Sequence, residues 1–148
     1  MSQQTERAFL IQHVCLSDIQ FSTKALPSDL GGKWEPNANF EINVKDTSLS
    51  NDEFRVNLLI AIHVKQKHHE DTNKMVDVFS LSLEQTGFFV IKGYSEEDLD
   101  RLLKSFCPNI LFPYARQMVT QMTTQAGYPP LNLSPVDFET RYQESKSK

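Results

Sequence analysis

The sequence predicts an α+β fold in which a four-stranded antiparallel sheet is followed by helices. Apolar and polar residues alternate along most of the chain up to Gly93, which is typical of strands with one buried face. Beyond Gly93 the apolar residues recur at intervals of three and four, as on one side of a helix. The chain has 148 residues, the usual size of one domain.

The first predicted strand covers residues 8–21, where the alternation is loose. A strict period of two places Phe9, Ile11 and Cys15 on one face. The opposite face then receives Leu10, Val14 and Leu16. Because both faces carry apolar side chains, we expect this strand to be covered on both sides.

Three further strands follow, each with one apolar face. Residues 40–45 alternate simply, and residues 53–65 have the cleanest period of two in the chain. The fourth strand is predicted over residues 74–85, with Met75 and Phe79 on the same face. The apolar face of the third strand is formed by Phe54, Val56, Leu58, Ile60, Ile62 and Val64.

The last third of the chain predicts three helices. Ser95 is placed as the N-cap of the first, and the acidic residues after it suit a helix N-terminus. We expect this helix to end at Cys107-Pro108, because the residue before a proline avoids the α conformation. A longer helix then runs to Ala126, and a third begins at Ser134-Pro135.

Composition argues against several classes of protein. The formal net charge of −4 disfavours nucleic acid as the main partner, since phosphate binding needs a basic surface. No apolar run approaches the ~20 residues of a spanning helix, so we expect no direct membrane insertion and a soluble, cytoplasmic protein. Cys15 and Cys107 are far apart, which predicts reduced, buried thiols. Residues 1–148 are expected to form a single domain with flexible ends at 1–7 and 143–148.

The residues that a catalyst or a metal site would need are mostly missing. The run His68-His69-Glu70-Asp71 is better explained as a solvated hairpin tip, since adjacent side chains in a turn rarely converge on one ion. Cys107 lacks a histidine nearby in sequence and is expected to be a buried structural thiol. The sequence has no glycine-rich phosphate loop. We therefore expect a protein without enzyme activity, metal or cofactor.

The chain carries more apolar surface than one such domain easily covers. The predicted strands have amphipathic faces, and the long helix adds a stripe that includes Leu111 and Met118. Uncovered apolar stripes indicate self-assembly or a surface for clients. The alternative is a monomer in which the helices cover the sheet completely.

Four stretches resemble the SecB protein-export chaperone family. Residues 107–116, Cys-Pro-Asn-Ile-Leu-Phe-Pro-Tyr-Ala-Arg, are similar to the segment that opens the long helix of the family. Residues 131–138 are similar to the second family block, at the same distance downstream. Trp34-Glu35-Pro36 and residues 88–93 fall where the family carries Trp-x-Pro and Gly-x-Phe-x-Ile-x-Gly. The resemblance extends from about Phe9 to Tyr142.

The resemblance implies an ATP-independent chaperone that is a homotetramer, built as a dimer of dimers with the long helices between the sheets. Such a protein binds unfolded precursor proteins in long apolar grooves, without a cofactor, and delivers them to the SecA motor of the translocon. Trp34 matches the family tryptophan on the loop that lines the groove. The other client-binding positions that the resemblance implies are Ala38, Phe40, Ile42, Val44, Leu133, Val136, Phe138 and Tyr142.

The resemblance also implies an assembly surface and a docking surface for SecA. Asp18 matches one acid of the SecA-binding patch, whereas Ser22 and Ser82 stand where the family often has glutamates. Because these two positions lack charge, we expect weakened SecA binding. Glu84 and Asp77 are nearby in sequence and could supply part of the missing charge. The expected tetramer contacts on the fourth strand and the long helix are Leu81, Leu83, Gln85, Tyr114, Met118 and Met122.

Two other functions fit the same pattern. A bent antiparallel sheet around a long helix also suits a hotdog-like thioesterase or a carrier of small apolar ligands. Such enzymes usually place a carboxylate on the central helix, and the stripe of Leu111, Tyr114, Met118 and Met122 offers none. The third possibility is a SecB-like chaperone dedicated to one client, such as an antitoxin.

Overall fold

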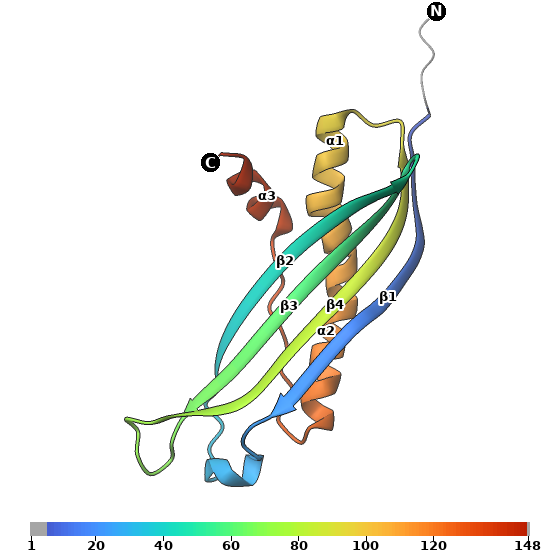
Figure 1. The fold of residues 1–148 in the computed structure, drawn as a ribbon. Coiled ribbons are helices and arrows are strands. Elements are labelled where there is room, and N and C mark those ends of the chain that lie inside the picture. The colour runs from blue at the N-terminus through green and yellow to red at the C-terminus, as the bar shows by residue number, and fades with distance from the viewer. Residues whose placement is uncertain (1–5, 148) are drawn as a thin grey trace, which may run out of the picture.

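The computed structural model describes residues 6–147, which form a four-stranded antiparallel sheet followed by helices (Figure 1). The predicted α+β class is therefore confirmed. Residues 1–5 and 148, within the ends expected to be flexible, lie outside the described residues. The strand order is β1-β4-β3-β2, so β1 and β2 are the edges. The elements are β1 (Ala8–Thr23), a 3₁₀ turn (Pro27–Leu30), β2 (Asn37–Ser50), β3 (Glu53–Lys67), β4 (Met75–Lys92), α1 (Glu96–Arg101), a π-helical segment (Leu102–Phe106), α2 (Cys107–Gln125) and α3 (Phe138–Lys146).

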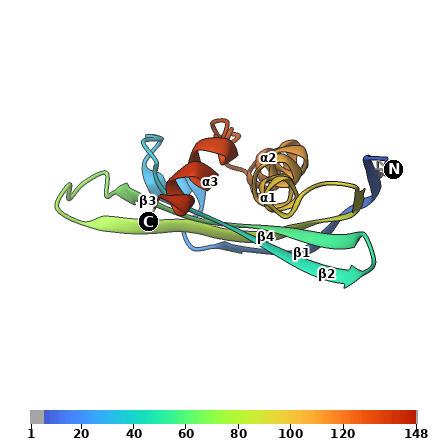
Figure 2. The ribbon, with the colours of Figure 1, turned by 90° about the horizontal axis from the view of Figure 1, so that it is seen from above.

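All the helices lie on one face of the sheet, and no other element of residues 6–147 covers the opposite face (Figure 2). We call the helix-covered side the inner face and the other side the outer face. The core lies between the inner face and α2, where Phe79, Phe89, Leu111 and Val119 are buried. Within the described residues, no helix combines the length and the apolar character needed to cross a membrane.

β1 differs from its predicted faces because it contains two bulges. Its pairing with β4 shifts at Gln12 and again at Ser17. Each extra residue moves the alternation by one position, so the prediction that Cys15 shares a face with Phe9 is wrong. The expected cover on both sides of β1 is also wrong, since the helices cover only its inner face. That face carries Phe9, Ile11, Val14, Leu16, Ile19 and Phe21.

A similar shift affects the start of β4. Val64 of β3 pairs with Phe79, but the next residue of β3 pairs with Asp77, which leaves Val78 as the extra residue. The prediction that Met75 and Phe79 share a face is therefore wrong, and Met75 is on the outer face.

β4 is longer than predicted, because it continues beyond Gln85 to Lys92. The strand passes through Gly87, where the helix layer comes close to the backbone. A Cβ atom there would lie 2.6 Å from the Phe89 ring and 2.9 Å from Leu111 Cδ2. Glycine is therefore used for close packing rather than as a strand end.

The predicted break at Cys107-Pro108 is absent. Residues 96–125 form one continuous rod, visible in Figure 1 as α1 and α2 end to end. The π-helical segment ends directly before Cys107-Pro108, and the Cys107 amide donates to the carbonyl of Leu102, five residues back. This wider turn accommodates a proline that lacks a backbone donor and would clash with a regular helical turn.

α3 begins later than predicted, because its N-cap is Asp137 rather than Ser134. The Asp137 carboxylate accepts the backbone N–H of Thr140 at 3.0 Å. Residues 129–137 form a lead-in without regular secondary structure, so Ser134 and Pro135 precede the helix instead of starting it. The helix then continues to Lys146.

Candidate functional site

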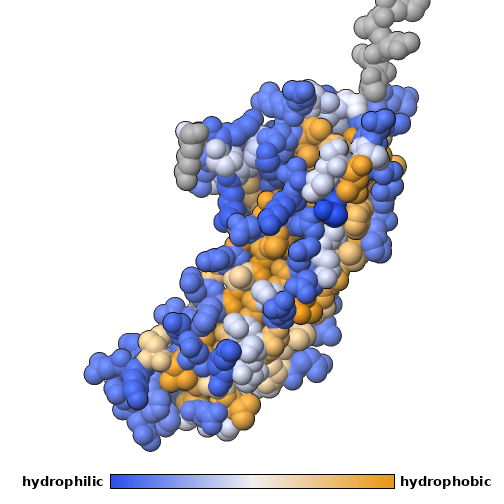
Figure 3. Space-filling view, viewed as in Figure 1, coloured by the Kyte–Doolittle hydropathy of each residue, from blue (hydrophilic) through white to orange (hydrophobic). Residues whose placement is uncertain are grey.

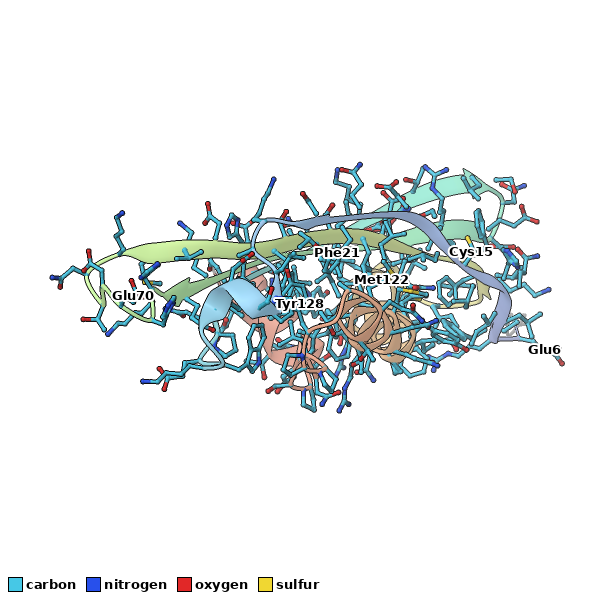
Figure 4. The ribbon with its side chains drawn as sticks, turned by 90° about the horizontal axis from the view of Figure 1, so that it is seen from below. Glu6, Cys15, Phe21, Glu70, Met122 and Tyr128 are labelled. Carbon is cyan, nitrogen blue, oxygen red and sulfur yellow. The ribbon has the colours of Figure 1, made fainter. Side chains whose placement is uncertain are left out.

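An aromatic cluster lies between the sheet and the helix layer, near the C-terminal end of α2. Trp34 stacks on Tyr128 with ring centroids 5.7 Å apart and planes at 27°. Tyr128 also packs against Phe21 and Phe79, at 6.5 Å and 4.9 Å between centroids (Figure 4). The Tyr128 hydroxyl donates to the carbonyl of Ala25 at 2.5 Å. Burial raises the pKa of Tyr128, so the hydroxyl remains a donor and the ring forms a fixed base for Trp34.

The loop that carries Trp34 is attached to β3 by a buried glutamine. The side-chain amide of Gln66 donates to the carbonyl of Lys33 at 2.8 Å and accepts the amide of Glu35 at 3.0 Å. Gly31, which begins the loop segment, has φ +66, and a Cβ atom there would lie 2.6 Å from the ring of His69. The tip of the β3–β4 hairpin therefore packs against this loop.

The inner face of β2 is only partly covered. Phe40 is 37% exposed, Ala38 is exposed and Val44 is half-buried, whereas Ile42 is buried. β2 pairs only with β3 within the described residues, so its other edge is open. At one point this edge is occupied, because Arg141 Nη2 of α3 donates to the carbonyl of Ile42 at 3.0 Å.

The side chains of α3 and its lead-in that were predicted to bind clients are buried. Phe138 is 3% exposed and meets Phe112 edge to face with centroids 6.0 Å apart. Tyr142 is buried, and its hydroxyl donates to Asp100 at 2.8 Å. Leu133 of the lead-in is also buried. These side chains hold α3 and its lead-in on the rest of the molecule.

Polar contacts also tie α3 to the long helix. Glu139 accepts from Ser105 Oγ at 2.7 Å and pairs with Arg101 at 2.8 Å. The bonds from Ser105, Gln143 and Arg101 lower the pKa of Glu139 to about 2, so it is charged at any ordinary pH. Ser105 lies on the π-helical segment, so this segment helps to hold α3 in place.

The structure brings together only part of the predicted client-binding set. Trp34, Ala38, Phe40 and Val44 lie on the inner side with accessible surface. Val136 faces elsewhere, into a hollow of about 680 Å³ that it shares with residues of α1 and the π-helical segment. The remaining predicted residues, Ile42, Leu133, Phe138 and Tyr142, are buried in the protomer.

The residues predicted to bind SecA lie together on the outer face. Asp18 and Glu84 are cross-strand partners, and Ser82 pairs with Gln20 on the same face. Ser22 and Ser82 both line a shallow hollow of about 510 Å³. Figure 3 shows this side of the molecule, where polar and apolar side chains are interspersed.

Charge on this face differs from the sequence-based expectation. Asp77 contacts His63 at 3.2 Å and Lys65 at 3.8 Å, so its charge is already partnered. Glu84 accepts from Asn57 at 2.9 Å and from Ser17 at 3.0 Å, which fixes its carboxylate in place. Sequence reasoning missed Glu41 of β2, which lines the same hollow as Ser82; its place on the polar face of a predicted strand was the available signal.

The residues predicted for tetramer assembly fall into two groups. Leu81 and Leu83 are 2% and 3% exposed on the inner face beneath α2, and Gln85 is also buried. In contrast, Tyr114 on α2 is 52% exposed, and Met118 and Met122 are half-buried. The helix therefore offers surface to another subunit, whereas the strand residues already belong to the core of one chain.

The cysteine and histidine side chains considered for catalysis or metal binding have structural roles. Cys107 is fully buried, which raises the pKa of its thiol to about 12 and keeps it protonated. Cys15 is only half-buried, so the prediction that both thiols are buried is wrong for Cys15. His68 Nδ1 accepts the amides of Glu70 and Asp71 and so closes the hairpin turn. Among residues 6–147, no three His, Cys, Asp or Glu side chains are placed to hold a metal ion.

The fold has a known structural counterpart. The SecB-like chaperone of Mycobacterium tuberculosis, solved in complex with a ChAD peptide from the HigA1 antitoxin, matches with a TM-score of 0.68. The match covers 86% of this chain and 90% of that chain at 18% identity, so it speaks for the fold alone.

Sequence comparisons identify the family. The protein-export protein SecB of Methylococcus capsulatus is 38% identical over 143 residues, which are 97% of this chain and 88% of the relative. Protein-export protein SecB 2 of Francisella tularensis subsp. novicida is 33% identical over 146 residues, 99% of this chain and 95% of the relative. The family model described as preprotein translocase subunit SecB matches residues 2–148. The chain therefore belongs to the SecB family.

Proposed function

We propose that this protein is an ATP-independent export chaperone that binds non-native precursor proteins along the inner side of β2 and the aromatic cluster at Trp34. The observation that carries the proposal is Phe40, a large apolar side chain that is 37% exposed on an open edge strand. Membership of the SecB family supports the role in export. The family is one of chaperones, and the proposed binding needs no nucleotide, metal or cofactor.

The open edge and the aromatic cluster complement each other as a binding surface. The backbone groups of an edge strand can pair with any extended peptide, whatever its sequence. A peptide paired on one side of the Arg141 contact then meets alternate inner-facing side chains, which are Ala38 and Phe40 on that side and Val44 on the other. A folded protein has already paired its own backbone, so this surface selects chains that are not yet folded.

Replacing Phe40 by alanine should weaken the binding of an unfolded precursor by about 1–3 kcal/mol, the usual effect of removing an aromatic hot spot. The fold should persist, because Phe40 is largely outside the core. Isothermal calorimetry with a permanently unfolded precursor measures the affinity. Emission of Trp34, the single tryptophan, reports contact near the cluster.

A matched control lies on the same strand. Leu49 is an exposed apolar residue of β2 near the β2–β3 turn, far along the strand from Trp34. Leu49→Ala should leave affinity unchanged. Equal losses in both variants would indicate general apolar adhesion, and no loss for Phe40→Ala would place the client elsewhere.

We infer that the chains assemble as a homotetramer through the outward side of the long helix. Tyr114 and Phe106 are exposed on this rod, at 52% and 47%. Apolar residues of the β1 edge, Leu10 and Ile11, are also exposed and offer a second contact. We also place the protein in the cytoplasm, where precursors wait for export.

The outer face is the proposed docking surface for SecA. Asp18 and Glu84 lie side by side there, and Glu41 adds a third carboxylate near Ser82. Exposed ion pairs contribute about 0–1 kcal/mol each, and they also accelerate encounter. With Ser22 and Ser82 uncharged, binding should be weak and sensitive to salt.

The double change Ser22→Glu and Ser82→Glu should tighten SecA binding several-fold at low salt, because it extends the acidic patch formed by Asp18 and Glu84. Client affinity should not change, since the client surface lies on the inner face. Calorimetry at low and moderate salt measures both. Tight SecA binding by the unmodified protein, insensitive to Asp18→Asn, would show that another surface carries the contact.

A dedicated client is the second candidate function. Its motivation is the mycobacterial SecB-like chaperone, which was solved with an antitoxin peptide. The two functions differ in selectivity. A general export chaperone should bind several unrelated unfolded precursors with similar affinity, whereas a dedicated chaperone should prefer one peptide by orders of magnitude.

A further inference from the structure

Gln66 is a polar side chain in an unexpected place. It lies near the end of β3, on the inner face opposite Val76 of β4, and is 2% exposed. Burying an amide costs free energy unless its donor and acceptor are both satisfied. Both are satisfied here, by the carbonyl of Lys33 and the amide of Glu35.

These two partners flank Trp34 in the sequence. The same pattern occurs in a parallel sheet. There, one residue donates its N–H to the carbonyl of residue i−1 on the neighbouring strand, and its own carbonyl accepts the N–H of residue i+1. The side-chain amide of Gln66 thus acts in place of a strand neighbour beside Trp34. It fixes the direction of the backbone at Trp34, while Tyr128 fixes the plane of its ring.

Backbone hydrogen bonds give the segment just before Trp34 little support of their own. Gly31 and Gly32 both have positive φ, at 66° and 77°, in a region that glycine adopts at low cost. The amide of Lys33 reaches the carbonyl of Leu30 only at 3.4 Å. We propose that Gln66 is the positioning residue that holds Trp34 ready for the client. The proposal rests on the proposed client-binding function.

A loop that is fixed in advance loses less conformational freedom when a client binds. Gln66→Met keeps the length of the side chain and removes both hydrogen bonds. In the free protein, Trp34 emission should shift to longer wavelength and acrylamide quenching should increase. Affinity for an unfolded precursor should fall about tenfold.

The neighbouring side chains provide matched controls. Gln66 forms its hydrogen bonds with backbone atoms of Lys33 and Glu35. Lys33→Ala and Glu35→Ala should therefore leave the Trp34 spectrum and the client affinity unchanged. A purely structural role would lower the unfolding midpoint without changing the Trp34 spectrum of the folded protein. That result, or unchanged client affinity in a folded Gln66→Met protein, overturns the proposal.

A measurement on the unmodified chain covers the case in which the variant does not fold. The amide of Glu35 donates to Gln66, so its hydrogen exchange should be at least tenfold slower than in an unstructured peptide. Exchange at the unprotected rate overturns the positioning role. If the wild type binds no unfolded precursor, the proposed function fails instead, and the Trp34 spectra still decide whether Gln66 positions the loop.

Discussion

A chain carrying Leu83→Asp should fail to fold, whereas one carrying Ser82→Asp should fold normally. Leu83 is buried beneath α2, and its neighbour Ser82 is on the outer face. Burying a carboxylate without a partner costs several kcal/mol, which is comparable with the total stability of about 5–15 kcal/mol of a typical domain. Far-UV circular dichroism and urea denaturation of the two variants, one residue apart, measure the difference.

The result also decides what Leu81 and Leu83 do. The resemblance to the family suggested that they form the tetramer interface, yet both are buried within one chain. If Leu83→Asp yields a folded dimer by light scattering, the residue belongs to an interface and the protomer tolerates its exposure. Loss of secondary structure at every concentration supports a role in the protomer core.

Phe138→Ala should release α3 from the molecule. Removing a buried phenylalanine costs about 3–5 kcal/mol, and a helix of nine residues is not stable without its tertiary contacts. We expect the amides of Phe138–Lys146 to exchange rapidly, with little change in the sheet. Hydrogen exchange followed by mass spectrometry separates the two regions.

Phe106→Ala is the matched control for this variant. Phe106 lines the same hollow as Phe138, but it is 47% exposed, and its ring contacts Phe9. Its removal should leave the exchange of α3 unchanged. Slow exchange of α3 in Phe138→Ala would show that the polar contacts of Glu139 and Arg141 are sufficient to hold the helix.

The parts of the fold that local periodicity determines could be predicted from the sequence. In β3 the even-numbered residues from 54 to 64 all face inward, because no bulge interrupts them. β1 could not be predicted in the same way, since the bulges at Gln12 and Ser17 leave no distinct residue pattern. The continuous long helix depends on a π-helical turn before Pro108, which is a tertiary adjustment.

The site was predicted in part for a similar reason. Trp34 and Phe40 were selected by their resemblance to family positions, and both keep accessible surface in the structure. That they bind clients stays a prediction. The third strand was predicted only to residue 65, so Gln66 fell just outside it. The even-numbered series of β3 includes position 66, so the period of two was the signal that could have placed it inside.

The hydrogen bond from Arg141 to the carbonyl of Ile42 bears on how a chaperone avoids the aggregation of its own clients. An uninterrupted edge strand can act as a template on which one chain after another adds in cross-β fashion. The guanidinium occupies an acceptor within β2, so a strand that runs along its whole length must first displace a charged side chain. Within residues 6–147, no strand pairs with the shorter segments of Asn37–Ser50 on either side of it. A short client strand can pair with them, whereas growth of a fibre from this edge is opposed.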